Sequence, residues 1–171
     1  MSLPGTGIRA AVVTVSDKGY AGTREDSSGP LLRDLLREMG AEAGEPRVVP
    51  DEQPLIEELL RELADSGEVD LVLTTGGTGL APRDRTPEAT LAVIDRTAPG
   101  LPEAMRAASL AITPRAMLSR AAAGVRRATL IINMPGSLKA CREHFEVIAD
   151  ALPHAIETLT GTAHECAAPS D

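Results

Sequence analysis

The chain has 171 residues, a length typical of one domain, and 43% hydrophobic and 25% charged residues are ordinary for a globular protein. A formal net charge of −8 and only two aromatic residues argue against a nucleic-acid partner, because nucleic-acid binders are usually basic and often stack bases on aromatic rings. The first ten residues lack the apolar stretch of a signal peptide, and no run is long enough to span a membrane. We therefore expect a cytoplasmic protein that does not associate with a membrane.

Strands and helices alternate along the first half of the chain. A continuous apolar run at 8–15 predicts a buried strand, which a polar loop follows. We expect the next helix to be capped by Ser28 and to end at Gly40. A second strand near 45–49 precedes a helix that Pro54 opens. The inward face of that helix is predicted to carry Leu55, Ile56, Leu59, Leu60 and Leu63.

The second half continues the alternation less regularly. An apolar strand at 69–75 runs directly into a glycine-rich turn, and a short helix is expected from Thr86. Only part of the Ala-rich segment at 100–128 has a helical pattern. An apolar strand at 129–133 precedes a helix that begins at about 138 and continues through Leu152 on one stripe.

This alternation predicts an α/β three-layer sandwich, in which a mostly parallel sheet is covered by helices on both faces. No repeat or linker divides the chain, so we expect one domain at 8–161 between flexible segments at 1–7 and 162–171. The cysteines and histidines lack metal-ligand spacing. We therefore predict that none of them is a ligand or a catalytic base: Cys141, Cys166, His144, His154 and His164.

Chemically distinctive residues follow four of the predicted strands at their carboxyl ends, where open α/β sheets bind ligands. The segments are SDKGYAG, PDEQ, TTGGTG and NMPGS. Three glycines within 76–79 let the backbone approach a ligand closely, although they serve a tight turn equally well. The turn lacks the lysine of a P-loop, and no dinucleotide fingerprint follows the first strand. A nicotinamide oxidoreductase is thereby disfavoured.

Two carboxylates, Asp51 and Asp84, lie just beyond predicted strand ends. Mg²⁺ prefers hard oxygen ligands that it shares with phosphate groups, so two carboxylates on one rim of the sheet would suit it. Arg83, Arg85 and Lys139 are the cations that could contact phosphate there, and ordinary surface charge is the alternative for each.

At this point the residues resemble a known family. The segments TVSDKGYAGTREDSSG, LTTGGTGLAPRDRTPEAT, AMLSRAAAGVRRATLIINMPGS and PG-x-x-EAMR are similar to those of Mog-type molybdopterin adenylyltransferases. That family includes the MogA and MoaB proteins and the G domain of gephyrin. The resemblance covers about 8–160, nearly the whole chain. One departure is visible: the family commonly reads PGSPK where this chain reads PGSLK.

The resemblance implies a molybdopterin-binding fold, a homotrimer, and transfer of AMP from Mg-ATP to the terminal phosphate of molybdopterin with release of pyrophosphate. It also implies hand-over of the product to a molybdate-inserting enzyme. Asp51 and Asp84 match the family's essential acidic positions, and are expected to be catalytic and to bind Mg²⁺. The other positions that match nucleotide- or pterin-binding segments are Ser16, Asp17, Thr75, Gly76, Gly77, Thr78, Gly79, Ser119, Arg120, Asn133, Pro135, Gly136, Ser137 and Lys139.

Two alternatives stay open at this stage. The first is a non-catalytic trimeric carrier that binds molybdopterin without consuming ATP. The second is an unrelated Mg²⁺-dependent nucleotide enzyme, which would act without any pterin and would leave the AMLSR and NMPGS segments unexplained.

Overall fold

A central sheet of seven strands organises the fold of the computed structural model, which describes residues 6–162. The strand order is β2-β1-β4-β7-β6-β5, and β3 pairs with β1 beyond the end of β2. All pairings from β2 and β3 through β7 are parallel, whereas β6 and β5 join antiparallel. The strands are β1 (Arg9–Val15), β2 (Glu42–Ala43), β3 (Arg47–Val49), β4 (Leu71–Thr75), β5 (Arg96–Thr97), β6 (Ala123–Arg126) and β7 (Thr129–Met134).

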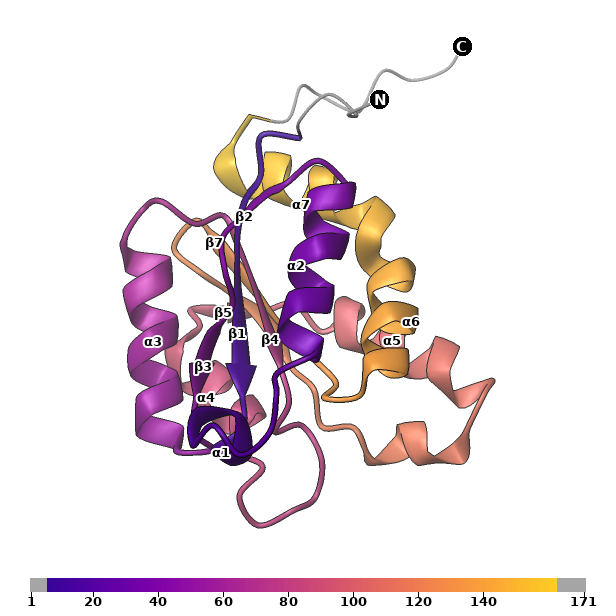
Figure 1. Cartoon of the computed structure of the whole chain (residues 1–171). Coiled ribbons are helices and arrows are strands. Elements are labelled where there is room, and N and C mark those ends of the chain that lie inside the picture. Colours follow the sequence, from indigo (N-terminus) through magenta and orange to yellow (C-terminus); the bar gives the residue numbers. More distant parts are fainter. Residues whose placement is uncertain (1–5, 163–171) are drawn as a thin grey trace.

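Helices cover both faces of this sheet, as Figure 1 shows. On one face lie α2 (Ser28–Glu38), α5 (Gly100–Leu110), α6 (Leu138–Ile148) and α7 (Leu152–Thr160). On the other face lie α3 (Gln53–Asp65) and α4 (Thr86–Val93). The remaining short elements are α1 (Asp17–Tyr20), η1 (Pro114–Leu118) and η2 (Ala149–Ala151). The predicted α/β three-layer fold with a mostly parallel sheet is confirmed.

The central strands are apolar throughout because helices bury both of their faces. Neighbouring residues of β1 point to opposite sides: Val12 belongs to the apolar cluster that includes α2 and α6, whereas Val13 belongs to the cluster that includes α3 and α4. The same alternation places Leu73 and Val72 of β4 in the two separate clusters. Aliphatic side chains pack against both faces of the sheet. This packing holds the strand ends in fixed positions, where a site can form.

Local details differ from the sequence prediction at three places. The N-cap position of α2 is Ser27 and not Ser28, and the first-turn N–H of Gly29 donates to Asp26 Oδ1 at 3.0 Å. Leu55, predicted to face inward, is 44% exposed at the first turn of α3. The single helix predicted from 138 through Leu152 divides into α6, η2 and α7, since Pro153 has no N–H to continue the helical hydrogen bonds.

The segment at 100–128 was only partly predicted. Its helix is present as α5, but β6 within it and β5 just before it did not show in the pattern. β5 has two residues and β6 has four, so neither is long enough to display a period of two. Both strands form by pairing at the edge of the sheet: β6 pairs with β7, and β5 pairs with β6.

Some predictions concern residues outside the described range. The ends expected to be flexible, 1–7 and 162–171, fall almost entirely there, and so do His164 and Cys166. Between residues 6 and 162, no helix combines the length and the apolar character that crossing a membrane requires.

Candidate functional site

A cavity of about 320 Å³ lies at the carboxyl ends of β1 and β4. Its walls come from segments far apart in the chain: the end of β1 with α1, the loop at 24–28, the loop after β3, the turn after β4 and the loop after β7. The predicted site residues that line it are Ser16, Asp51, Thr75, Gly76, Gly77, Asp84 and Gly136. The topology therefore brings together four strand ends that sequence reasoning singled out separately.

The turn that follows β4 needs glycine for two independent reasons. Gly76 and Gly77 have φ of +96° and +68°, which L side chains rarely adopt. A Cβ on Gly76 would collide with the carbonyl oxygen of Val15, and one on Gly77 would collide with Oγ1 of Thr86. The Thr86 hydroxyl also donates to the Gly76 carbonyl at 2.9 Å and holds the turn against α4. The glycines thus make a tight turn and leave a bare cavity wall at the same time.

Asp51 is fixed at the cavity by a reciprocal pair of hydrogen bonds with Asp17. The Asp17 N–H donates to Asp51 Oδ2 at 2.8 Å, and the Asp51 N–H donates to Asp17 Oδ1 at 2.9 Å. The second oxygen, Oδ1, lies 3.3 Å from where a Cβ on Gly77 would be, so it borders the glycine turn. Burial raises the pKa of the Asp51 carboxyl, and the negative charges of Asp17 and Asp84 act in the same direction.

Arg83, a candidate for phosphate contact, is engaged with carboxylates. Its Nε donates to Asp17 Oδ2 at 2.6 Å, and its Nη2 donates to Asp17 Oδ1 at 3.0 Å and to Glu52 Oε1 at 2.8 Å. This guanidinium lowers the pKa of Asp17. Asp17 is therefore neutralised within the fold, while its neighbour Asp51 has no guanidinium hydrogen-bonded to it among the described residues.

Arg120 fastens the loop that carries Asp84. Its Nε donates to the Gly79 carbonyl at 2.7 Å, and its Nη2 donates to the Asp84 carbonyl, also at 2.7 Å. The guanidinium is completed by an ion pair with Glu88 of α4. Asp84 Oδ2 accepts from the Ala81 N–H at 3.0 Å, which sets the direction of the carboxylate. Arg120 thus acts on the site through the loop and does not line the cavity.

Asp26 is a cavity carboxylate that the sequence analysis missed. Besides accepting from the Gly29 N–H in the first turn of α2, it accepts a hydrogen bond from the Thr14 hydroxyl at 2.7 Å, and it lines the same cavity as the glycine turn. A usable signal was present, because an acidic side chain shortly before a helix can accept from the free N–H groups of its first turn. The cap was instead assigned too late in the chain, at Ser28.

The Asn133 side chain is a structural brace. It is fully buried, donates to the hydroxyls of Thr74 at 3.1 Å and Thr90 at 2.8 Å, and accepts from the Ala122 N–H at 3.1 Å. Both N–H donors and the carbonyl oxygen of the amide therefore have partners, which belong to β4, α4 and the residue just before β6. Asn133 therefore holds the sheet and does not line the cavity.

The rest of the predicted set does not form the wall of the cavity. Ser137 caps α6 by accepting from the Ala140 N–H at 3.3 Å, and Lys139 is 78% exposed, 3.7 Å from Glu143. The predicted residues that do not line the cavity are Asp17, Thr78, Gly79, Ser119, Arg120, Asn133, Pro135, Ser137 and Lys139. No group of three His, Cys, Asp or Glu residues arranged to hold a metal exists in residues 6–162.

Comparisons with known proteins point to one family. A family model described as "Probable molybdopterin binding domain" matches residues 11–154. A molybdopterin adenylyltransferase from Haemophilus influenzae is 42% identical over 168 residues, covering 90% of this chain and 85% of that protein. The Escherichia coli enzyme of the same name is 41% identical, covering 94% and 89%. The crystal structure of the molybdopterin biosynthesis enzyme MoaB from Thermus thermophilus is 51% identical, with a TM-score of 0.85 over 90% of this chain and 97% of that one.

Proposed function

The chain belongs to the molybdopterin-binding domain family, and on that premise we propose that it is a molybdopterin adenylyltransferase of molybdenum cofactor biosynthesis. It transfers AMP from ATP to the terminal phosphate of molybdopterin and releases pyrophosphate. The observation that carries this proposal is the single cavity that Asp51, Asp84 and the Gly76–Gly77 turn line together. Relatives of that name match about nine-tenths of the chain and support the same activity.

The reaction needs alignment more than it needs a base. A phosphate monoester has a second pKa of about 6, so the attacking phosphate oxygen is already mostly ionised at neutral pH. Its bond to the α-phosphorus of ATP forms as the bond to the pyrophosphate oxygen breaks, and no proton has to be removed. In keeping with this, none of the described residues that line the cavity is a histidine or a cysteine. Positioning and charge neutralisation are what the protein must supply.

The described residues fit a magnesium ion that is shared with a nucleotide. Mg²⁺ usually takes one or two protein carboxylates and completes its octahedron with phosphate oxygens and water. Asp51 and Asp84 offer those carboxylates in the same cavity, and no group of three or more His, Cys, Asp or Glu residues in 6–162 is arranged as a protein-only metal site. When bound there, Mg²⁺ would neutralise negative charge on the triphosphate and the departing pyrophosphate.

The fold supports this role by keeping Asp51 ionisable and oriented. Asp17 receives the Arg83 guanidinium and in turn holds the Asp51 backbone and carboxylate, so Asp51 is positioned without losing its charge to an internal partner. Arg120 does the corresponding work for the Asp84 loop. The bare Gly76–Gly77 wall lets phosphate groups approach the backbone, which side chains would prevent.

A homotrimer, hand-over of the product to a molybdate-inserting enzyme and a cytoplasmic location stay predictions from the resemblance and the sequence. A non-catalytic pterin carrier is disfavoured, since the relatives bear the name of a transferase and this chain keeps both acidic positions. The remaining alternative, a pterin-independent nucleotide enzyme, is disfavoured by the family match.

Mixing the purified protein with molybdopterin and Mg-ATP tests the proposal. We expect mass spectrometry to find adenylylated molybdopterin, and we expect one pyrophosphate for each AMP transferred. Binding of molybdopterin with no ATP consumed would identify a carrier instead. Pyrophosphate release in the absence of pterin would identify an unrelated nucleotide enzyme.

A further inference from the structure

Arg24 is the one arginine or lysine among the described residues that line the cavity at the carboxyl ends of β1 and β4. Four carboxylates line the same cavity: Glu25, Asp26, Asp51 and Asp84. The Arg24 side chain is exposed, and no hydrogen bond or ion pair joins it to another residue in 6–162. Its guanidinium is therefore available to a ligand that enters this otherwise acidic cavity.

The cations of the other strand-end loops are engaged within the chain or lie outside the cavity wall. Arg83 donates to two carboxylates, and Arg120 donates to backbone carbonyls of the loop that carries Asp84. Neither of them lines the cavity, and Lys139 does not line it either. Arg24 therefore differs from these three cations in its position, and from the two arginines also in having no internal partner among the described residues.

The backbone that carries Arg24 is tied to the framework of the site. Arg24 lies in the loop that runs from α1 to α2 beyond the carboxyl end of β1 (Figure 1). Its N–H donates to the Lys18 carbonyl of α1 at 3.2 Å, and the first residue of α1 is hydrogen-bonded to Asp51. Two residues further on, Asp26 accepts from the Thr14 hydroxyl of β1 at 2.7 Å. These bonds fix the loop, while the Arg24 side chain keeps the freedom to reach a ligand.

The charges of the two substrates indicate which one needs this cation, and the inference rests on the proposed adenylyltransferase reaction. The triphosphate of ATP arrives with Mg²⁺, which neutralises much of its charge. The terminal phosphate of molybdopterin is a monoester, which carries about −1.5 to −2 at neutral pH and has no such counterion. Four cavity carboxylates would repel it. We propose that Arg24 binds the terminal phosphate of molybdopterin and holds it for attack on the α-phosphorus of ATP.

An arginine suits this role because of its shape as well as its charge. The planar guanidinium can donate two parallel hydrogen bonds to two oxygens of one phosphate, and it stays charged at every pH at which the protein is folded. A phosphate held in this way keeps its third oxygen available for attack. Arg24 thereby serves the pterin phosphate, whereas Asp51 and Asp84 serve the nucleotide through the metal ion.

Equilibrium binding of molybdopterin and of its phosphate-free form, both measured without ATP, tests the proposal. Arg24→Gln should bind molybdopterin about tenfold more weakly than the wild-type protein and the phosphate-free pterin equally well. Arg24→Lys, which keeps the charge, should recover most of the lost affinity. Arg96→Gln is the matched control, since it removes the same charge from an exposed position on β5 that lines a different hollow, and it should bind both pterins normally.

Steady-state kinetics separate the two substrates. Arg24→Gln should raise the KM for molybdopterin by about tenfold and leave the KM for Mg-ATP within about twofold. Unchanged affinity for molybdopterin, an equal loss for both pterins, or a rise in the KM for Mg-ATP instead would overturn the proposal.

Failure of the proposed function would give a different result. A wild-type protein that forms no adenylylated product would refute the transferase. If Arg24→Gln still weakened binding of the phosphorylated pterin alone, the contact between Arg24 and the phosphate would be upheld in a protein that only binds molybdopterin.

Discussion

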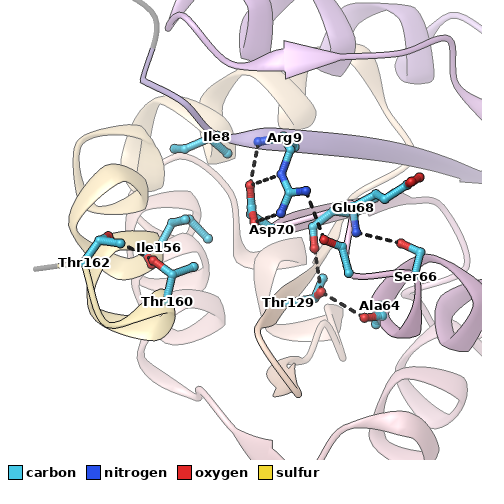
Figure 2. Close-up of polar contacts among 12 residues, drawn as sticks. Ile8, Arg9, Ala64, Ser66, Glu68, Asp70, Thr129, Ile156, Thr160 and Thr162 are labelled. Atoms are coloured by element: carbon cyan, nitrogen blue, oxygen red, sulfur yellow. Dashed lines mark hydrogen bonds and ion pairs between the residues drawn. The ribbon is translucent and has the colours of Figure 1, made fainter.

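Each end of the central sheet carries an aspartate, and the two aspartates have opposite roles. At the amino ends of the strands, Asp70 is enclosed by Arg9, whose backbone N–H, Nε and Nη2 all donate to its carboxylate at 2.9, 3.1 and 2.7 Å. Figure 2 shows this pair beside the Thr129 hydroxyl, which donates to the Val69 carbonyl at 2.7 Å. At the carboxyl ends, Asp51 is partly buried, and no arginine within residues 6–162 forms a hydrogen bond with its carboxylate.

The difference shows in the direction of the two pKa shifts. Hydrogen bonds from Arg9 lower the pKa of Asp70, whereas burial raises the pKa of Asp51. A carboxylate whose charge is balanced inside the fold contributes stability, and one whose charge is left unbalanced contributes affinity for an external cation. The amino end of the sheet therefore holds the chain together, and the carboxyl end is available for ligands.

The substitution Asp51→Asn should show the largest difference between the two ends of the sheet, because it should reduce activity and leave stability nearly unchanged. The amide can keep the hydrogen bond from the Asp17 N–H but lacks the charge that a divalent ion requires, so AMP transfer should fall by about a thousandfold or more. The unfolding midpoint in urea should change little. Full turnover of this variant would remove Asp51 from the chemistry.

Gly77→Ala should impair both activity and stability. The residue has φ of +68°, and the added Cβ would collide with Thr86 Oγ1, so we expect a loss of about 2 kcal/mol or more in unfolding free energy and a collapse of turnover. Gly67→Ala is the control: its φ is +72°, but open space surrounds it, so only about 1 kcal/mol and no turnover should be lost. Equal effects in urea unfolding would show that φ alone matters.

Asp70→Asn should give the reverse of the Asp51 result. Loss of the charge weakens the paired bonds with Arg9, and we expect about 1–3 kcal/mol less unfolding free energy, with turnover of the folded protein kept. Urea unfolding together with the transfer assay measures both. Loss of turnover without loss of stability would contradict the proposal that Asp70 serves stability and Asp51 serves ligand binding.

Lowering the pH should abolish ligand binding at the carboxyl ends of the strands before it destabilises the amino ends. Ionised Asp51 is needed for cation binding, and its raised pKa means that binding of Mg-ATP should begin to fail at a higher pH than for an ordinary aspartate. The pKa of Asp70 is lower in the folded protein than in the unfolded chain. The ionised carboxylate therefore stabilises the fold at any pH above the unfolded-state pKa, and this stabilisation is lost as the pH falls through the folded-state pKa. Calorimetric binding and circular dichroism between neutral and acidic pH should therefore show ligand loss before unfolding. Simultaneous loss would contradict the assignment.

Much of this arrangement could be predicted because short, continuous segments of the sequence determine it. Continuous apolar runs revealed the strands, and the topology of parallel strands then required their carboxyl ends to meet, which placed Asp51 and Asp84 on one edge. The tight fit of Gly76 and Gly77 explains why the sequence alone left their role divided between turn and ligand contact. The turn depends on the missing Cβ, and the predicted ligand contact would depend on it too.

The contacts between distant segments could not be predicted in this way. Arg83 and Asp17 are 66 positions apart, and Arg120 reaches the Gly79 carbonyl over 41 positions. A motif shows that such cations are near a site, but not whether they face a ligand or another part of the chain. Asn133 illustrates the same limit, since its buried amide bonds to Thr74 and Thr90 and does not line the cavity.

The most direct test of the account is the Mg²⁺ dependence of ATP binding, measured by titration calorimetry on the wild-type protein, Asp51→Asn and Asp84→Asn. We predict that Mg²⁺ strengthens ATP binding to the wild-type protein and that either substitution abolishes this gain, while the weak metal-free binding persists. An Mg²⁺ dependence unchanged in both variants would contradict the claim that the two carboxylates hold the ion beside the glycine turn.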